Sequence, residues 1–444
     1  MLKKLFYRVL VAVYPILMTI LFVFFLMNIN NVGIENSHIW ILSLAYCFCL
    51  YVFFIIYYGN KIGVYRIVEI MYSNALSLLI TNVIFGLFLV VLLQCIDWGL
   101  YFVLLFVGQL VCSGIWTIVC NSIQMKIYGS HRILLISSDK KSAETLHKKL
   151  DNRKNRFFIK EIIYSDSGAE KILDRCKEYG TIMIDDLDQD LRNIITNYCF
   201  ENGKVMFMVP MIAEIIRNGA QALHIIDTPL YVTKKYPLTI EQAIVKRAVD
   251  LILTGIATII ASPFMLVTAL AIKLYDGGPA LYKQKRLTKD GKEFYVYKFR
   301  SMIVDAEKNS GARLSSGEND DRITKVGKVI RAIRFDELPQ LFNILKGDMS
   351  IVGPRPERPE IASNIYYEEL PEFKYRLKVK AGLTGYAQVY GKYNTTPKDK
   401  LKLDLMYINN YSLYLDLKVI FYTVKILFMK ESTEGIEEGK TTAA

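Results

Sequence analysis

Residues 331–357 read R-A-I-R-F-D-E-L-P-Q-L-F-N-I-L-K-G-D-M-S-I-V-G-P-R-P-E, and the middle of this stretch predicts a short helix. Four apolar residues recur at the spacing of one buried helical face: Leu338, Leu341, Phe342 and Leu345. Proline is tolerated only in the first turn of a helix, so Pro339 predicts a helix that begins near Asp336. Gly347 follows as a normal helix stop.

Charged residues surround this predicted helix. Asp336 and Glu337 are adjacent carboxylates at its start, where the helix dipole is positive. Three arginines flank them in the sequence: Arg331, Arg334 and Arg355. The last lies between two prolines, each of which fixes its own φ, so its backbone is stiff and extended. Adjacent carboxylates, fixed arginines and a helix N-terminus are what phosphoryl transfer requires. An Asp N-cap with surface charges is the alternative interpretation of the same residues.

The composition indicates a membrane protein with charged partners. The chain has 444 residues, of which 52% are hydrophobic, and its formal net charge is +12. A mean hydropathy of +0.24 is high for a soluble protein of this length. A basic balance suggests nucleic acid, anionic lipid or phosphorylated substrates, and the apolar segments favour the last two.

Cysteine and histidine both lie well before the 331–357 stretch in the sequence. The seven cysteines end at Cys199 and the four histidines at His224, with neither a disulfide framework nor zinc-ligand spacing. We therefore expect the chemistry of the C-terminal half to use neither residue type.

Four charge-free apolar runs, each long enough for a helix to cross a bilayer, occupy residues 9–27, 39–58, 75–94 and 100–119. Lysine and arginine precede the first run and follow the second and fourth, whereas the loop at 28–38 has neither. The positive-inside rule then predicts that the N-terminus and everything after the fourth run face the cytoplasm.

Residues 126–232 have a different pattern. Predicted strands at 132–137, 158–164, 181–185 and 205–209 alternate with helical patterns at 142–150, 169–179 and 187–202. This alternation is typical of a parallel, Rossmann-like α/β unit. Its first strand-to-helix turn contains no glycine, although a dinucleotide-binding turn needs several. We expect a structural or regulatory role, and nucleotide binding is doubtful.

Residues 251–272 form a fifth charge-free run, interrupted near its middle by Ser262 and Pro263. Crossing the membrane here would carry a lysine- and arginine-rich segment outside, against the positive-inside rule. Proline breaks or kinks a helix, and a neighbouring serine hydroxyl can satisfy a freed carbonyl. We therefore predict a re-entrant helix that enters and leaves by the same face. The alternative is an ordinary proline-kinked spanning helix.

A β-hairpin is predicted at 281–287 and 293–300, because an Asp-Gly turn lies between the two runs. The period of two puts Lys298 and Arg300 on one face of the second strand, as a phosphate site or as a solvated face. We predict a mobile loop at 306–321, an interfacial helix at 412–430 with Lys418 and Lys425 toward lipid headgroups, and a disordered tail at 431–444.

Residues 239–430 resemble the monotopic polyprenyl-phosphate phosphoglycosyl transferases, which initiate bacterial capsule, exopolysaccharide and O-antigen synthesis. The resemblance rests on K-R-A-V-D (246–250), S-P (262–263), Q-K-R (284–286), Y-K-F-R-S-M (297–302), the 331–357 stretch, A-G-L-T-G-Y-A-Q-V (381–389) and L-D-x-x-Y (403–407). The N-terminal part is similar to the large branch of that family, apart from the missing glycines.

The resemblance implies transfer of a sugar-1-phosphate, with glucose or galactose as the expected sugar, from a UDP-sugar to undecaprenyl phosphate, with release of UMP. It implies that Asp336 is the nucleophile of a covalent phospho-sugar intermediate. Glu337 would position Mg²⁺ together with Asp336, or adjust the properties of Asp336. Arg355 and Arg331 would clamp the diphosphate, and the secondary binding candidates are Lys298, Arg300, Arg334 and Asp404.

The expected fold is membrane α plus α/β. It comprises a four-helix transmembrane domain (1–125), a Rossmann-like cytoplasmic domain (126–232), a monotopic catalytic α+β domain (233–430) and a polar tail (431–444). The expected partners are the UDP-sugar, undecaprenyl phosphate and membrane lipid in the bacterial inner membrane, without nucleic acid, and a homodimer is left open. A non-catalytic membrane scaffold or regulator, and a basic nucleic-acid or lipid receptor, are the competing interpretations.

Overall fold

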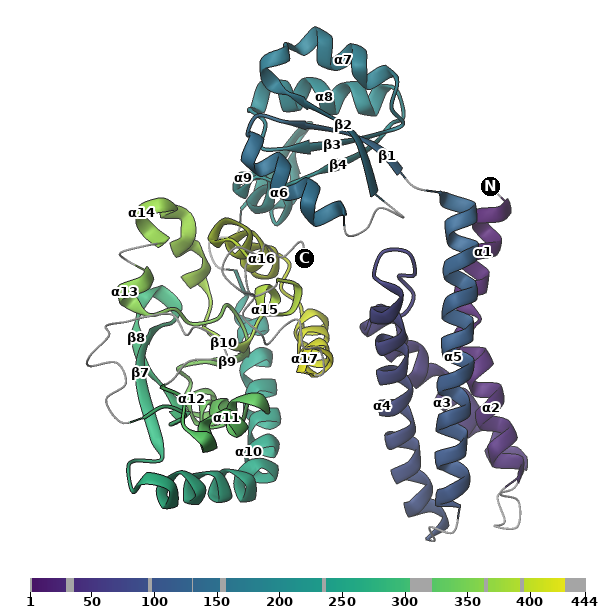
Figure 1. The fold of residues 1–444 in the computed structure, drawn as a ribbon, viewed down its shortest axis with the longest axis vertical. Coiled ribbons are helices and arrows are strands. Elements are labelled where there is room, and N and C mark those ends of the chain that lie inside the picture. The colour runs from purple at the N-terminus through teal and green to yellow at the C-terminus, as the bar shows by residue number, and fades with distance from the viewer. Residues whose placement is uncertain are drawn as a thin grey trace. The chain divides into compact units, whose positions relative to one another are not determined.

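The computed structural model describes residues 2–28, 36–94, 98–129, 131–151, 157–233, 237–303, 322–362, 366–391 and 395–427. The protein is mostly helical, with several apolar helices near the N-terminus and a four-stranded parallel sheet (Figure 1). The chain divides into two compact units between Val209 and Pro210. The predicted loop at 306–321 and the tail at 431–444 lie outside the described residues.

The first unit begins with five helices: α1 (Leu2–Ala12), α2 (Tyr14–Asn28), α3 (Asn36–Ile56), α4 (Ile67–Leu93) and α5 (Gly99–Tyr128). Four segments here are long and apolar enough to cross a membrane, and each overlaps one predicted run: Leu5–Asn28, His38–Ile56, Ile67–Leu93 and Gly99–Ile127. Their spanning and its direction stay predictions.

Buried polar side chains join these helices. The hydroxyl of Tyr46 donates to Asn82 at 2.9 Å, Asn82 donates to Gln109 at 2.8 Å, and Gln109 donates back to Tyr46 at 2.9 Å. This ring connects α3, α4 and α5, so the polar groups satisfy one another inside an apolar bundle.

The sheet follows, with strand order β2-β1-β3-β4 and every neighbouring pair parallel. Its strands are β1 (His131–Ser137), β2 (Phe157–Tyr164), β3 (Thr181–Asp185) and β4 (Val205–Met208), and its helices are α6 (Lys140–Asp151), α7 (Ala169–Lys177) and α8 (Gln189–Glu201). Alternate residues of β1 enter two different apolar clusters: Leu134 and Ile136 one, Ile133 and Leu135 the other. Helices therefore cover both faces, which confirms the predicted parallel α/β arrangement.

The turn after β1 uses its own carboxylate to cap α6. Asp139 accepts hydrogen bonds from the amides of Lys141 at 3.0 Å and Ser142 at 3.1 Å. In dinucleotide-binding folds such helix N-terminal amides bind phosphate. Asp139 occupies the amides of Lys141 and Ser142 here and adds negative charge at this helix end. The role expected for this unit stays a prediction.

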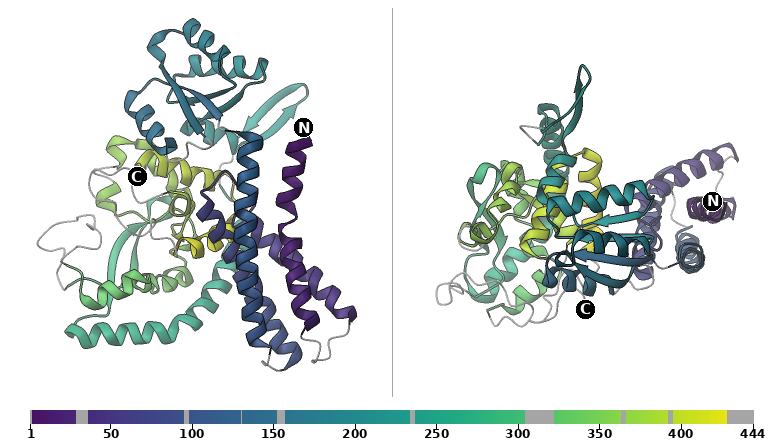
Figure 2. Two further views of the ribbon diagram at one scale, coloured as in Figure 1. Left: turned by 45° about the vertical axis from the view of Figure 1, so that its right-hand side comes forward. Right: turned by 90° about the horizontal axis from the view of Figure 1, so that it is seen from above.

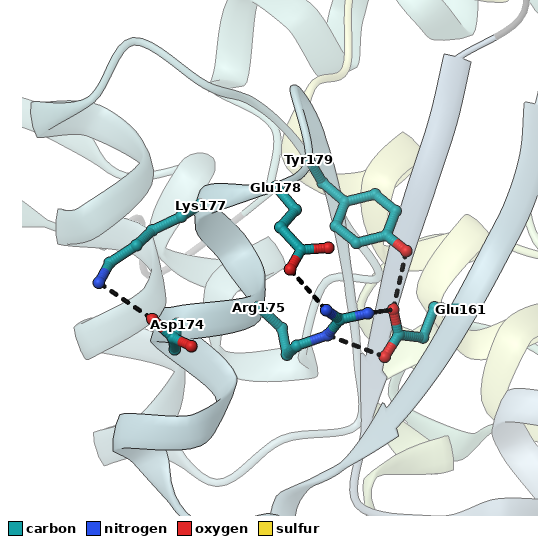
Figure 3. Close-up of polar contacts among 6 residues, drawn as sticks. All are labelled: Glu161, Asp174, Arg175, Lys177, Glu178 and Tyr179. Atoms are coloured by element: carbon teal, nitrogen blue, oxygen red, sulfur yellow. Dashed lines mark hydrogen bonds and ion pairs between the residues drawn. The ribbon is translucent and has the colours of Figure 1, made fainter.

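An ion-pair cluster ties α7 to the edge strand β2 (Figure 3). The guanidinium of Arg175 contacts both oxygens of Glu161, at 3.1 and 2.5 Å, and Tyr179 donates to Glu161 at 2.7 Å. Arg175 also contacts Glu178 at 2.6 Å. The bidentate geometry fixes the guanidinium plane against the strand.

The second unit starts with α9 (Ile212–Asn218) and the antiparallel hairpin β5 (Gln221–Ile225) and β6 (Thr228–Val232), which the sequence did not predict. Every residue of these two strands is exposed, and the right-hand view of Figure 2 shows the pair as a long two-stranded hairpin. Helix α9 packs against α16 (Pro397–Asn409), where Asn409 donates to the carbonyl of Ile215 at 3.0 Å. The domain boundary predicted at residue 232 stays a prediction.

Helix α10 (Ile240–Asp276) contains the fifth apolar run, and Figure 1 shows it bending partway along its length. Pro263 lies inside the helix and has no amide hydrogen for the carbonyl of Ile259. The hydroxyl of Ser262 donates to that carbonyl at 2.8 Å, as predicted. Exposed apolar residues lie on both sides of the proline, among them Ile259, Ile260, Leu266 and Val267. Whether α10 is re-entrant or spanning stays a prediction.

The predicted hairpin is confirmed: β7 (Leu281–Leu287) pairs antiparallel with β8 (Glu293–Phe299) across the Asp-Gly turn. The remaining α-helices and strands are α11 (Lys325–Ala332), α12 (Gln340–Lys346), β9 (Ser350–Val352), α13 (Pro359–Ile361), α14 (Tyr367–Glu369), β10 (Gly382–Thr384), α15 (Tyr386–Tyr390) and α17 (Leu413–Leu427), and a 3₁₀ helix occupies Pro371–Lys378. Strands β9 and β10 pair in parallel.

The prediction that both lysines of the last helix face lipid headgroups is wrong for Lys425. Its side chain is only 4% exposed and lies over the ring of Tyr422. The seven-residue spacing puts both lysines on one side of α17. Near the C-terminal end of α17, where Lys425 lies, that side is buried against the protein.

Candidate active site

The two adjacent carboxylates do not begin an α-helix. They belong to a 3₁₀ turn, Phe335–Glu337, entered through Arg334 with a left-handed backbone (φ 56°). Pro339 is the N-cap of α12, which starts only at Gln340. The predicted helix start is therefore wrong by four residues, because the proline occupies the cap position rather than the first turn.

The buried face of α12 also differs from the prediction. Its buried residues are Gln340, Leu341, Asn343 and Ile344, whereas Phe342 is 45% exposed. The amide of Asn343 explains the difference: it accepts from the Tyr297 backbone at 2.9 Å and donates to the Tyr295 carbonyl at 2.7 Å. A polar residue thus anchors α12 to β8, and apolar periodicity could not reveal it.

Phe335 fixes the turn from the other side. It packs on a cluster formed by α10, α11 and β8, whose buried members are Met265, Ile272, Phe299 and Ile330. Its ring meets that of Phe264 at 6.0 Å in an edge-on arrangement. The residue next to Asp336 therefore rests on the apolar helix close to Pro263.

Glu337 is held by two cations. Its Oε1 lies 3.1 Å from Nη2 of Arg355 and 3.4 Å from Nζ of Lys298, and its side chain is 16% exposed. Burial alone would raise the pKa of Glu337, but Arg355, Lys298 and Arg334 together lower that pKa well below its usual range. Glu337 is thus a fixed anion, with Oε1 committed to the protein.

Asp336 has a different environment. Within the described part of the chain its carboxylate accepts no hydrogen bond and lies in no ion pair. Burial, reinforced by the neighbouring charge of Glu337, raises the pKa of Asp336, while Lys298, Arg331 and Arg355 act in the opposite direction. A half-buried carboxylate without a partner is poised to attack a phosphorus atom or to bind a cation.

The backbone of the G-P-R-P-E segment (353–357) is fixed by hydrogen bonds from residues outside this segment. Four successive carbonyls, those of residues 354–357, accept hydrogen bonds from the Gly382 amide (2.9 Å), Arg376 Nη2 (3.0 Å), Arg286 Nη1 (3.0 Å) and the Leu287 amide (3.0 Å). Each flanking proline lacks an amide hydrogen, so carbonyls are the main points at which this segment can be fixed. The direction of Arg355 is therefore set by distant parts of the chain.

Sequence reasoning missed the buried ion cluster behind this segment. Arg376, 3% exposed, lies 2.9 Å from Glu357 and 2.8 Å from Asp404, and Lys400 also contacts Glu357. Burial opposes ionisation of Glu357, but Lys400 and Arg376 lower its pKa to about 2. No local pattern marks Arg376, because its partners are far away in the sequence.

The other predicted site residues are distributed around the centre. Arg331 is half-buried in the last turn of α11, and its charge acts on Asp336. Arg300 is 8% exposed and pairs with Asp276 at the end of α10, so it does not share the Glu337 contact of Lys298. Asp404 is 1% exposed and pairs with Arg376.

The K-R-A-V-D motif fixes α10 to this framework. Lys246 pairs with Asp416 of α17 at 2.6 Å, and Arg247 donates to the carbonyls of Ile344 (2.6 Å) and Leu345 (2.8 Å) at the end of α12. Asp250 accepts from the amide of Ile351 at 3.1 Å. Three charged residues on one helix thus bind three elements of the site's scaffold.

Comparisons with known proteins point to one family. The sequence model described as bacterial sugar transferase matches residues 241–430. The chain is 36% identical over 255 residues (56% of this chain, 59% of the relative) to the UDP-N-acetylgalactosamine-undecaprenyl-phosphate N-acetylgalactosaminephosphotransferase of Aeromonas hydrophila. It is 39% identical over 221 residues (48% and 45%) to the UDP-glucose:undecaprenyl-phosphate glucose-1-phosphate transferase of Klebsiella pneumoniae.

A third relative is matched over almost its whole length. The exopolysaccharide production protein PSS of Rhizobium leguminosarum bv. phaseoli is 42% identical over 199 residues, which are 43% of this chain and 97% of that protein. By contrast, the matches span about half the length of the first two relatives. The family model, over residues 241–430, covers the part of the chain that contains the site.

Proposed function

Because the chain belongs to the bacterial sugar transferase family, we propose that it transfers a sugar-1-phosphate from a UDP-sugar to undecaprenyl phosphate and releases UMP. The substrate classes in this proposal come from the names of two relatives. One of these names specifies N-acetylgalactosamine and the other glucose as the sugar. The proposal also places the reaction at the first membrane step of exopolysaccharide or capsule synthesis, on the cytoplasmic face of the inner membrane.

The observation that carries the proposal is the contrast between two adjacent carboxylates. Glu337 is fixed by Arg355 and Lys298, whereas Asp336 has no partner among the described residues. A scaffold protein would have no use for a half-buried carboxylate left unpaired beside fixed cations. For phosphoryl transfer, in contrast, an available nucleophile next to fixed positive charge is the required arrangement.

The reaction proceeds in two displacements. An oxygen of Asp336 attacks the sugar-bearing phosphorus, the bond to the bridging oxygen breaks, and UMP leaves with that oxygen. A phosphate oxygen of the lipid then attacks the same phosphorus and releases the Asp336 carboxylate, giving undecaprenyl-diphosphate-sugar. Neither displacement requires proton transfer, so the absence of histidine from this half of the chain is no obstacle.

Fixed cations supply the electrostatic contribution. Arg355 can face the diphosphate with its planar, forked donors, and the charge of Lys298 lies on the same side of Glu337. Arg331 adds positive charge near Asp336. Their role is to stabilise the charge that moves to the leaving UMP.

The residues present fit a magnesium ion held together with substrate. Mg²⁺ usually takes one or two carboxylates and completes its shell with water and substrate phosphates. Both cation contacts of Glu337 fall on Oε1, so Oε2 and the oxygens of Asp336 remain for a metal. Among the described residues no group of three or more His, Cys, Asp and Glu suits a metal. Bound Mg²⁺ would neutralise part of the diphosphate charge.

The test uses the full-length protein in membranes supplied with undecaprenyl phosphate and a panel of radiolabelled UDP-sugars. We expect lipid-extractable label and stoichiometric UMP with one or a few of these sugars. Asp290→Asn, at the exposed hairpin turn, is the matched control and should leave the yield unchanged. A wild-type protein that transfers label from no UDP-sugar would favour the scaffold alternative.

A further inference from the structure

The direction of Arg355 depends on a residue that neither the sequence motifs nor the comparisons assign to the site. Arg376 donates from Nη2 to the carbonyl of Arg355 at 3.0 Å. The same guanidinium contacts Asp404 through Nε at 3.0 Å and Glu357 through Nη1 at 2.9 Å. All three of its nitrogen atoms therefore have partners, and two of those partners lie in the G-P-R-P-E segment.

Arg376 is itself held rigidly. It is 3% exposed, and its guanidinium carbon lies 4.7 Å from the centre of the Phe373 ring. Asp404 lies on α16, is 1% exposed and contacts the guanidinium of Arg376 at 2.8 Å. Glu357 is fixed in turn by Lys400, also on α16. A planar side chain with partners in fixed directions transmits position better than a flexible ammonium group.

The two flanking prolines alone cannot set the position of Arg355. They restrict the local backbone of Arg355 to an extended form but do not determine where that backbone lies in the protein. The Arg355 side chain must reach Glu337 at 3.1 Å, so a shift of its carbonyl displaces the guanidinium. Displacements of about 1 Å in a positioning group can cost on the order of 100-fold in rate.

We propose that Arg376 is a positioning residue for the transfer reaction, which holds the carbonyl of Arg355 so that the Arg355 guanidinium faces Glu337 and the diphosphate. This inference rests on the proposed function, because Arg355 is its point of action. Asp404 then serves the reaction through Arg376 rather than by touching substrate.

A double-mutant cycle tests the proposal. Arg376→Lys keeps the charge but cannot reach Asp404, Glu357 and the Arg355 carbonyl in one geometry, so kcat/KM should fall about 100-fold. In an Arg355→Lys background the same change should cost no more than about threefold, because the group that it positions is already gone. Full multiplication of the two losses would overturn the proposal.

Matched controls exclude a general loss of folding. Arg175→Lys alters a bidentate Arg–Glu pair in the α/β sheet (Figure 3) and should leave kcat/KM unchanged. Asp404→Asn is the second variant for the same network and should reproduce the coupling to Arg355 if Arg376→Lys yields too little folded protein. Activities are compared per folded protein, with thermal unfolding measured for each variant.

Hydrogen exchange separates this inference from the proposed function. Arg376→Lys should raise amide exchange in residues 350–360, and Arg175→Lys should not, whether or not any UDP-sugar is turned over. Unchanged exchange in that segment would overturn the positioning role. A wild-type protein without transfer activity, but with the expected exchange result, would instead refute only the proposed reaction.

Discussion

Nη2 of Arg355 lies 3.1 Å from Oε1 of Glu337, and this contact separates the roles of two neighbouring carboxylates. Glu337 becomes a fixed anion of lowered pKa, whereas Asp336 remains without a partner among the described residues and has a raised pKa. The sequence places the two side by side, but only the structure shows that the ion pair engages Glu337 and not Asp336.

The first prediction concerns Asp336. Purified protein with magnesium and its UDP-sugar should release about one UMP per active site without undecaprenyl phosphate, and should gain the mass of a sugar phosphate. Asp336→Asn should abolish both signals, because a neutral amide does not form the acyl phosphate. Rapid-quench measurement of UMP and intact mass spectrometry provide the readouts.

Glu337→Gln is the companion variant. It should slow the burst but leave the adduct on Asp336, since the proposed role of Glu337 is to position Mg²⁺ and not to attack. A burst that survives Asp336→Asn would refute the assignment of the nucleophile. Absence of burst and adduct in the active wild type would favour direct attack by the lipid phosphate.

The second prediction tests the proposed contact between the forked guanidinium of Arg355 and the diphosphate. Arg355→Lys retains one positive charge but loses bidentate contact, so we expect kcat/KM to fall about 100-fold with near-normal abundance in membranes. Arg217→Lys, an exposed arginine on α9, is the control. Turnover near that of the wild type would reduce Arg355 to a surface charge.

The third prediction concerns α10. A cysteine at the exposed position Lys289, in a background without native cysteines, should react with a membrane-permeant maleimide and not with an impermeant one. A cysteine at Asn28, next to the loop that lacks lysine and arginine, should react with both. Labelling of position 289 from outside would mean that α10 spans the membrane.

Pro263→Ala should then shift α10 toward spanning. The new amide can bond to the carbonyl of Ile259, which already receives the Ser262 hydroxyl. The gain should therefore stay below the ~3 kcal/mol typical of removing a proline from a helix interior. The fraction of position 289 labelled by the impermeant reagent measures the shift.

The fourth prediction is a pH dependence of stability through Glu357. Its folded pKa is about 2 against an ordinary value of 4.5. The lowered pKa means that its stabilising contribution is present above about pH 4.5 and is lost as the pH falls toward 2. The full contribution is on the order of 3 kcal/mol, from ~1.4 kcal/mol per pKa unit.

Thermal unfolding in detergent between pH 7 and pH 3 provides the measurement. Glu357→Gln should lower the melting temperature at pH 7 and flatten its decline below pH 4.5. Glu170→Gln, at an exposed position on α7, should reproduce the wild-type curve. An unchanged pH profile in Glu357→Gln would show that the Arg376–Glu357–Lys400 cluster contributes nothing measurable.

The sequence by itself determined the elements that depend on local pattern. Apolar runs of about 20 residues, the alternation of strands and helices, and the Asp-Gly hairpin are properties of neighbouring residues, and the structure confirms the corresponding helices, parallel sheet and β7–β8 pair. The Ser262 hydroxyl on the carbonyl that Pro263 leaves free is equally local, and it was predicted.

Only the tertiary structure decided what depends on distant partners. In the structure α12 begins only at Gln340. Asn343 is buried because its side-chain amide has its hydrogen-bond partners on β8. The tertiary structure also buried Lys425 and brought Arg376 to the carbonyl of Arg355, 21 residues earlier in the chain. Ion pairs and side-chain hydrogen bonds between remote segments leave no periodicity in a sequence, because their geometry exists only after the chain has packed.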